Sequence, residues 1–280
     1  MKKIPNPPRR CIFCGGTPIT KEHIFAAWMR DFLPTIPNSR TDHDTSLGRR
    51  DLKSGKIMSY STSKGKLDKP GDHRSRGLRV VCRNCNNGWM SEIQNIAKPI
   101  LIPFLKGQWP RITQDDQYIL SVWAAMFSMV FEFAHPETVG ISQDHRTFLK
   151  EFKQHKTMPK NWFVWIGQFD DQSRNLPIWH RGLGIFKEDT QIPDGITKPM
   201  NTQMTLFAAG GIVFLTFSTC VDDEIFSTIQ YALRTTEQSF GFRRIWPTSM
   251  PHTFINGLLN RRIIHNDFGV IIQSMTAVFI

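Results

Sequence analysis

The chain has 280 residues, of which 40% are hydrophobic and 21% are charged. These proportions are typical of a globular protein and exclude a disordered chain, and the length allows one large domain or two ordinary ones. The formal net charge of +11 favours a polyanionic partner, because a strongly basic protein usually binds nucleic acid or another negatively charged polymer.

The excess of positive charge lies entirely in the first part of the chain. Residues 1–110 contain 20 Lys and Arg against 8 Asp and Glu, whereas residues 111–280 contain 15 against 16. Segregation of this kind is typical of a phosphate-binding surface on one module. We therefore expect nucleic acid to bind within residues 1–110.

The sequence shows no targeting signal and no convincing membrane span. Met1-Lys2-Lys3 is followed by the proline-rich residues 4–8, where a signal peptide would have an apolar run. The longest apolar stretch, residues 119–133, has about 15 residues and is too short to cross a bilayer comfortably. The sequence predicts a cytoplasmic protein without a membrane partner.

Residues 1–110 contain short regular elements around one irregular segment. Residues 20–24 are predicted to form a strand and residues 25–32 a short helix. A second strand is predicted over residues 78–81, and a helix begins near Asn86 and runs towards Pro99. Residues 35–77 are rich in polar and basic side chains with almost no apolar periodicity, so they are predicted to be a basic insertion.

Residues 111–280 are predicted to form a larger α+β accessory domain. Strands joined by short turns favour a mainly antiparallel sheet with packed helices. The periodicity predicts helices over residues 115–135, 143–155 and 224–234, and extended segments over residues 162–169, 177–186, 204–209, 212–217, 243–246 and 270–280. We expect this domain to select the target, form a homodimer or bind a regulatory protein.

Four of the five cysteines form two pairs, Cys11-x-x-Cys14 and Cys82-x-x-Cys85. Each pair places two sulfurs on one tight turn, which suits the bond lengths and tetrahedral angles that zinc prefers. A redox or disulfide pair is the alternative, but a cytosolic chain rarely keeps a disulfide framework. The spacing therefore predicts one structural Zn²⁺ ion bound by four thiolates.

Two stretches beside the cysteines carry further chemistry-bearing residues. The first is Thr20-Lys21-Glu22-His23-Ile24, and the second is Cys82-Arg83-Asn84-Cys85-Asn86-Asn87-Gly88-Trp89-Met90-Ser91. The order of cysteine pair, strand with Glu-His, return strand, cysteine pair and helix beginning with Asn resembles the HNH endonuclease family. Poorly characterised bacterial members with a CNNGWMS motif are especially similar. The resemblance implies that residues 1–110 form a zinc-stabilised ββα-metal module.

The resemblance also implies roles for three residues. His23 would be the general base that deprotonates the attacking water. Asn86 would hold a catalytic Mg²⁺ or Mn²⁺ ion, and Glu22 would bind the same ion or orient the site. The implied function is a metal-dependent endonuclease that hydrolyses phosphodiester bonds in nucleic acid, with DNA favoured over RNA.

The basic residues of the N-terminal part are candidates for nucleic-acid binding. They are Arg49, Arg50, Lys53, Lys64, Lys66, Arg74, Arg76, Arg79 and Arg83. The sequence departs from the family at the second strand, where residues 74–79 contain no Asn to fix the histidine ring; Asn84 or Asn87 is a candidate substitute. Two alternatives therefore stay open: a catalytically inactive, zinc-stabilised nucleic-acid-binding protein, and an RNase of the same fold.

Overall fold

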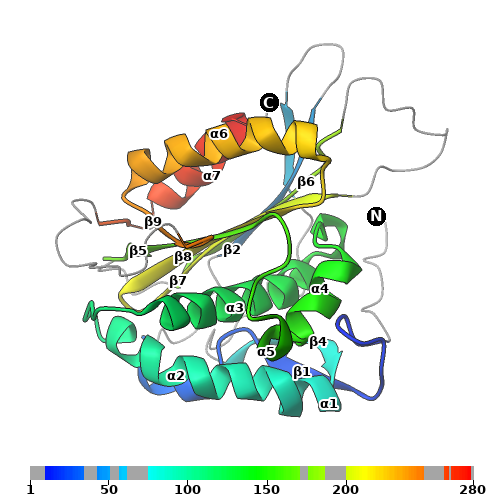
Figure 1. Cartoon of the computed structure of the whole chain (residues 1–280), viewed down its shortest axis with the longest axis vertical. Coiled ribbons are helices and arrows are strands. Elements are labelled where there is room, and N and C mark those ends of the chain that lie inside the picture. The colour runs from blue at the N-terminus through cyan, green and yellow to red at the C-terminus, as the bar shows by residue number, and fades with distance from the viewer. Residues whose placement is uncertain are drawn as a thin grey trace.

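The computed structural model describes residues 10–34, 43–50, 57–61, 75–170, 176–186, 200–248, 262–264 and 266–278. These residues form stacked layers (Figure 1). Helices α6 (Asp223–Phe240) and α7 (Asp267–Val278) cover one face of a seven-stranded sheet, and α3 (Gln114–Phe131) covers the other face. Beyond α3 lies a two-stranded sheet of β1 (Ile19–His23) and β4 (Gly77–Cys82). The predicted α+β class with mainly antiparallel sheets is confirmed.

The large sheet has the strand order β3-β2-β6-β7-β8-β5-β9. Its strands are β2 (His43–Arg50), β3 (Ile57–Ser61), β5 (Trp162–Gln168), β6 (Ile178–Leu183), β7 (Thr202–Ala209), β8 (Ile212–Thr219) and β9 (Arg243–Trp246). All neighbouring pairs are antiparallel except β2 with β6. Every residue of β7 and β8 is buried, because helices cover both faces of the sheet. Five of the six predicted extended segments in residues 111–280 are confirmed as strands.

The hairpin of β7 and β8 holds the end of a long N-terminal helix, α2 (Ser91–Leu105). Gly210 occupies the hairpin turn with φ +58°, and a Cβ atom there would lie 2.5 Å from the carbonyl oxygen of Leu105. Only glycine accepts both the positive φ and this close approach. The turn therefore fixes the C-terminal end of α2 against the sheet.

Part of the predicted basic insertion, residues 35–77, is regular structure. Strand β2 pairs with β3 in antiparallel register and with β6 in parallel register, His43 lying opposite Ile178. The prediction of an irregular segment is wrong for these two strands. Backbone hydrogen bonds to a neighbouring strand can order a polar segment, so such strands leave little apolar periodicity in the sequence.

The helix predicted from Asn86 begins earlier and ends later than expected. Its first residues form a short helix, α1 (Arg83–Cys85), and the segment η3 (Asn86–Met90), which is kinked at Gly88, where φ is −92° and ψ is −118°. Helix α2 then continues through Pro99 and Pro103 to Leu105. The predicted short helix over residues 25–32 is a 3-10 helix, η1 (Ala27–Asp31).

Helix α3 packs against both parts of the chain. The helix begins with a capping box. The Thr113 hydroxyl accepts a hydrogen bond from the backbone N–H of Asp116, and the Asp116 carboxylate accepts one from the backbone N–H of Thr113. These bonds satisfy N–H groups at the start of the helix that have no partner within it. On one side the Phe127 ring stacks on Phe207 of β7 at 3.8 Å, and on the other it lies 5.5 Å from the ring of Phe25. Residues 11–33, 78–112 and 120–245 consequently contribute to one hydrophobic cluster.

By length and composition, residues 114–134 pass the test for a membrane-spanning helix, but 83% of that apolar window is buried inside the protein. This is the burial expected of a core helix. The remaining short helices are η4 (Glu132–Ala134), η5 (Pro136–Thr138), α4 (Gln143–Lys150) and α5 (Phe152–His155). They lie on the same side of the sheet as α3 (Figure 1).

The prediction of an extended segment over residues 270–280 is wrong, because Asp267–Val278 form α7. The residues Val270, Ile271 and Ile272 suggest a strand because they are β-branched. However, the buried residues are Phe268, Ile271, Ile272 and Met275. This is the spacing of one helical face, which α7 buries in the cluster between the sheet and α6.

A buried ion pair supports the segment that follows α3. Glu132 Oε2 accepts hydrogen bonds from the backbone N–H groups of Gly140 (3.0 Å) and Ile141 (3.2 Å). Its Oε1 pairs with the guanidinium of Arg146 on α4, and both side chains are buried. The carboxylate thus joins three otherwise separate turns of the chain.

We expect Glu132→Gln to lower the free energy of unfolding by about 3–5 kcal/mol, because it leaves a buried guanidinium without a counter-charge. The matched control is Glu92→Gln, which removes an exposed ion pair with Lys153 and should cost about 0–1 kcal/mol. Urea denaturation of the two variants measures the difference. Equal losses of stability would contradict this account of the buried pair.

Candidate functional site

The first cysteine pair lies on a tight turn before β1. The backbone N–H of Gly15 donates to the Cys11 carbonyl at 2.8 Å, and the N–H of Cys11 donates to the Gly16 carbonyl at 3.0 Å. Gly15 has φ +69°, a conformation that favours glycine. The turn places Cys11 and Cys14 on the same side of the chain.

The second cysteine pair lies where β4 passes into α1. Cys82 is the N-cap of α1, and its Sγ accepts a hydrogen bond from the backbone N–H of Cys85 at 3.4 Å. The two turns are also joined by backbone bonds, since Ile12 N–H donates to the Val80 carbonyl at 3.0 Å. A strand end and a helix start therefore meet the first cysteine turn.

The four sulfur atoms lie within 4.8 Å of one another. The Sγ of Cys14 is 3.5 Å from the Sγ of both Cys82 and Cys85, far longer than a disulfide of about 2.05 Å. Zinc bound to four sulfurs at about 2.3 Å would space them about 3.8 Å apart. Burial raises the pKa of the Cys11 and Cys85 thiols, and a bound cation would offset that effect. The cluster can hold a metal ion such as zinc.

Asn86, which follows Cys85, is bonded to β1, the strand that carries Glu22 and His23. The Asn86 side-chain amide donates to Thr20 Oγ1 at 3.1 Å and to the Lys21 carbonyl at 3.4 Å, so Asn86 is anchored on β1. Burial raises the pKa of Glu22 to about 7, and the hydrogen bond from Asn86 opposes that rise.

The pairing of β1 with β4 is irregular at this point. Thr20 lies opposite Val81 and Glu22 lies opposite Leu78, so the register shifts between them. A Cβ atom on Gly77 would lie 2.3 Å from the Glu22 carbonyl oxygen, so only glycine allows the two backbones to approach this closely. Such bulges redirect side chains, and here both Glu22 and His23 line one cleft.

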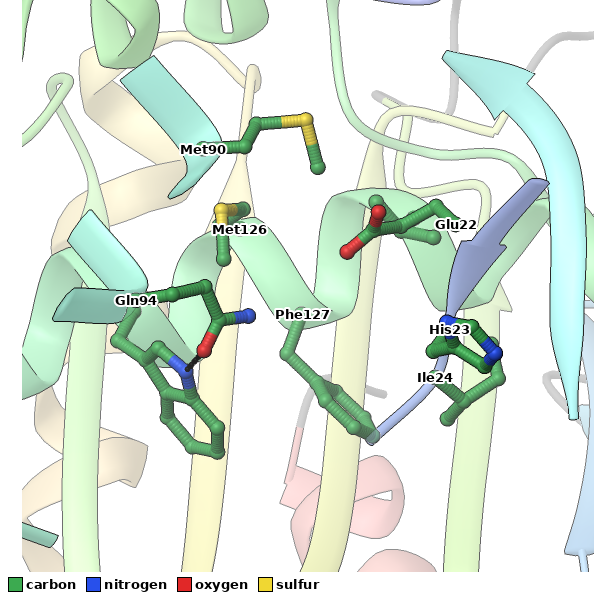
Figure 2. A pocket seen from close by; sticks show the side chains of 9 residues that line it. Glu22, His23, Ile24, Met90, Gln94, Met126 and Phe127 are labelled. Carbon is green, nitrogen blue, oxygen red and sulfur yellow. Dashed lines mark hydrogen bonds between the residues drawn. The ribbon is translucent and has the colours of Figure 1, made fainter. Parts of the chain in front are cut away.

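This cleft lies between β1, the start of α2 and α3, and encloses about 250 Å³ including its open mouth. In Figure 2 the side chains of Glu22 and Gln94 point into the same space from opposite sides. The remaining lining residues are His23, Ile24, Met90, Trp123, Met126, Phe127 and Val130. The Gln94 carbonyl oxygen accepts from the indole N–H groups of Trp28 (3.3 Å) and Trp123 (2.9 Å), which fixes the orientation of its amide.

The His23 ring contacts a cation. The Arg30 Nη2 lies 3.2 Å from His23 Nε2, and because a guanidinium can only donate, Nε2 is the accepting nitrogen of a neutral ring. Burial lowers the pKa of His23, and the positive charges of Lys21 and Arg30 lower it further. The ring is therefore neutral at pH 7, and its basic nitrogen, Nε2, can accept a proton once the Arg30 guanidinium has moved off it.

The basic residues predicted to bind nucleic acid lie on several elements and do not form one compact group. Arg79 and Arg83 are exposed on β4 and α1, and Arg76 precedes β4 and is half-buried. Arg49 and Arg50 belong to β2, at positions opposite Met58 and Ile57 of β3. Four predicted nucleic-acid-binding residues lie outside the described residues: Lys53, Lys64, Lys66 and Arg74.

Sequence reasoning missed three residues around the cleft: Arg30, Gln94 and Trp123. Each comes from a helix whose pattern indicates only a packing role, and no local motif connects it to Glu22 or His23. Arg30 contacts the His23 ring, which no Asn of the second strand, residues 78–82, could hold. Asn84 and Asn87, the candidate substitutes, are exposed.

Comparisons of this chain with protein-family models, with curated proteins and with solved structures give no match. The class that fold and site define is therefore a layered α+β protein with a four-cysteine cluster able to hold a metal ion. The HNH resemblance rests on the stretches around Glu22 and Asn86.

We expect protein purified without added metal to contain one zinc ion per chain. Cys85→Ser should lower this ratio and the melting temperature, because the free energy of metal binding is also folding energy. Elemental analysis and thermal unfolding measure the two effects. Cys220→Ser is the control and should change neither, since Cys220 does not belong to the cluster. A wild-type ratio near zero would refute the zinc assignment.

Proposed function

We propose that this protein is a metal-dependent endonuclease that hydrolyses phosphodiester bonds with the residues around Glu22, His23 and Asn86. One observation carries the proposal. Asn86 bonds Thr20, which lies 66 positions away in the sequence, beside a Glu-His pair that lines a cleft. The cysteine cluster lies where these two segments approach each other, and a structural metal bound there would hold them together.

His23 is the proton acceptor in the proposed reaction. Its ring is half-buried, lines the cleft and is neutral at pH 7, so it can take the proton of an attacking water molecule once Arg30 has left Nε2. The nearby guanidinium of Arg30 is suited to a phosphate oxygen, because it presents paired donors and keeps its charge. Together they would bind a phosphodiester and activate water beside it.

Glu22 and Asn86 are the proposed ligands of a catalytic Mg²⁺ or Mn²⁺ ion. Both side chains carry oxygen atoms, which these ions prefer, and Mg²⁺ usually takes only one or two protein ligands together with waters and a substrate phosphate. When bound, the ion would stabilise the negative charge on the phosphate and on the leaving oxygen. Asn86 is positioned for this role by its anchor on β1.

The substrate class follows from charge. The positive excess of the protein lies within residues 1–110, and Arg79 and Arg83 are exposed on the same module as His23. Phosphate contacts of this kind dominate affinity for nucleic acid. By resemblance to HNH endonucleases, DNA is the preferred substrate of the proposed enzyme. An RNase of the same fold is the alternative, and the assay below separates the two by comparing cleavage of DNA and of RNA.

A second candidate function is nucleic-acid binding without catalysis. The observation that favours it is the contact of the His23 ring with Arg30, in place of the asparagine that the family uses. Such a protein would keep the zinc cluster and the basic surface but cut no substrate. Both functions therefore predict binding of nucleic acid, and only the endonuclease predicts its cleavage.

We expect His23→Ala to lower cleavage by about 10²–10⁴-fold, the usual effect of losing a positioned acid–base group. Zinc content and nucleic-acid affinity should stay near those of the wild type, because His23 is not a ligand in the cysteine cluster. Plasmid DNA and RNA, each with Mg²⁺ or Mn²⁺, provide the assay. The control is His155→Ala. His155 belongs to α5, and its ring pairs with Glu151. A wild type inactive under all conditions would favour the binding protein.

Asn86→Ala should also impair cleavage, and higher concentrations of Mg²⁺ or Mn²⁺ should partly restore it, because the lost contact is to the ion. The dependence of the cleavage rate on ion concentration measures this effect. Asn87→Ala is the matched control, since Asn87 is exposed and is expected to leave the rate unchanged. Loss of activity that no ion concentration restores would argue against Asn86 as an ion ligand.

A further inference from the structure

Two lysines of α2 and its C-cap lie over two aromatic rings of η1 and its C-cap. Lys98 Nζ lies 5.7 Å from the centre of the Trp28 ring, and Lys106 Nζ lies 5.7 Å from the centre of the Phe32 ring. The two rings are 6.4 Å apart. Together with Arg30, which η1 places between them in sequence, these residues form what we call the η1–α2 ridge.

The aromatic part of the ridge is held in place. The indole N–H of Trp28 points inward and donates to Gln94 Oε1, which also accepts from the buried Trp123. Trp28 and Phe32 are half-buried, so each ring packs on the core and still reaches the surface. A ring that is already ordered loses little conformational entropy when another flat group stacks on it.

The charged part of the ridge is positive and exposed. Arg30, Lys98 and Lys106 are exposed. The acidic residue of η1 is Asp31, which is also exposed and contributes one negative charge. The acidic residue of α2, Glu92, is paired with Lys153 of α5. The described ridge therefore keeps a net positive charge, which complements a polyanion.

Arg30 connects the ridge with the cleft. Its guanidinium is 3.2 Å from the Nε2 atom of His23, which lines the cleft. A strand whose phosphates contact Lys98, Lys106 and Arg30 would thus end at the proposed proton acceptor. Interleaved cations and aromatic rings are the usual features of surfaces that bind single-stranded nucleic acid, because unpaired bases stack on the rings while the cations contact the backbone.

We propose that the η1–α2 ridge binds single-stranded nucleic acid and leads the strand to His23, an inference that rests on the proposed function for the identity of the site at its end. Phosphates bind Arg30, Lys98 and Lys106, and unpaired bases stack on Trp28 and Phe32. On binding, the lysine ammonium groups leave the ring faces for phosphate oxygens. A duplex offers no free base face, so it should bind the ridge more weakly.

The test measures binding and does not depend on cleavage. Fluorescence anisotropy is recorded with a labelled single-stranded oligonucleotide and with a duplex of the same length, using the full zinc-loaded chain carrying His23→Ala. The variants are Lys98→Gln with Lys106→Gln, Phe32→Leu and Phe32→Tyr. The charge-matched control is Lys150→Gln with Lys160→Gln, which removes one lysine of α4 and one exposed lysine between α5 and β5 that pairs with Asp223.

We expect the Lys98→Gln, Lys106→Gln protein to lose affinity for the single strand and to show a salt slope shallower by about 1.4, since each phosphate contact contributes about 0.7. Phe32→Leu should weaken binding roughly five- to a hundredfold, the usual effect of removing a stacking ring, whereas Phe32→Tyr keeps the ring and should bind like the parent. The control pair should leave the single-strand affinity and slope near the parent values.

Three results would overturn the proposal. One is equal affinity of the ridge variants and the control pair for the single strand. Another is tighter binding of the duplex, with no effect of Phe32→Leu. The third is displacement of the strand by polyglutamate at an equal concentration of charge, which would indicate a surface for acidic peptides without base stacking. A wild type that binds through the ridge but cuts nothing would reject the proposed function and keep the ridge.

Discussion

The packing of α3 between the large sheet and the N-terminal residues decides where the candidate site lies. Phe127 stacks on Phe207 of the sheet and also contacts Phe25, which follows β1. Trp123, one turn earlier, donates its indole N–H to Gln94 of α2. Because a close-packed interior tolerates little change in shape, these contacts hold β1 and α2 in fixed positions on α3. One wall of the cleft is consequently built by the part of the chain predicted to be an accessory domain.

The chain between the two cysteine pairs is anchored at a second place. It leaves Cys14, forms β1 and η1, contributes β2 and β3 to the large sheet beside β6, and returns through β4 to Cys82. Closing a loop of this length costs conformational entropy. The pairing of β2 with β6 shares that cost with the cysteine cluster, so the cluster and the sheet stabilise each other.

The cysteine cluster and the cleft have separate tasks. The cluster joins the end of β4 to the turn before β1, and this brings Asn86 onto β1 at Thr20. Among the residues that line the cleft, Glu22, His23 and Gln94 are polar and the others are largely apolar, and charged interactions are stronger in such surroundings than in water. Arg30 connects the cleft with the η1–α2 ridge, because its guanidinium contacts His23, which lines the cleft, and the residue lies between Trp28 and Phe32 in the sequence. Substrate binding and proton transfer would therefore depend on the same short helix.

By itself, the sequence determined the features that depend on residues close together in the chain. Two sulfurs per tight turn follow from each CxxC spacing, the start of α3 follows from Thr113 and Asp116, and the strands of the central hairpin follow from long apolar runs around Gly210. The helical period of Phe268, Ile271, Ile272 and Met275 was also present, but the β-branched residues of α7 obscured it. The fold class and the two sulfurs of each CxxC turn were predictable for this reason, whereas the meeting of the two turns is a long-range contact and was inferred from the four ligands that zinc prefers.

Only the tertiary structure decided the features that need distant residues to meet. Polar strands β2 and β3 are ordered by hydrogen bonds to another part of the sheet, which leave no apolar pattern of their own. Arg30, Gln94 and Trp123 surround Glu22 and His23 because η1, α2 and α3 pack together. Local patterns record which face of a helix is apolar. They do not record which other element that face will meet, because that choice is made by the packing of the whole core.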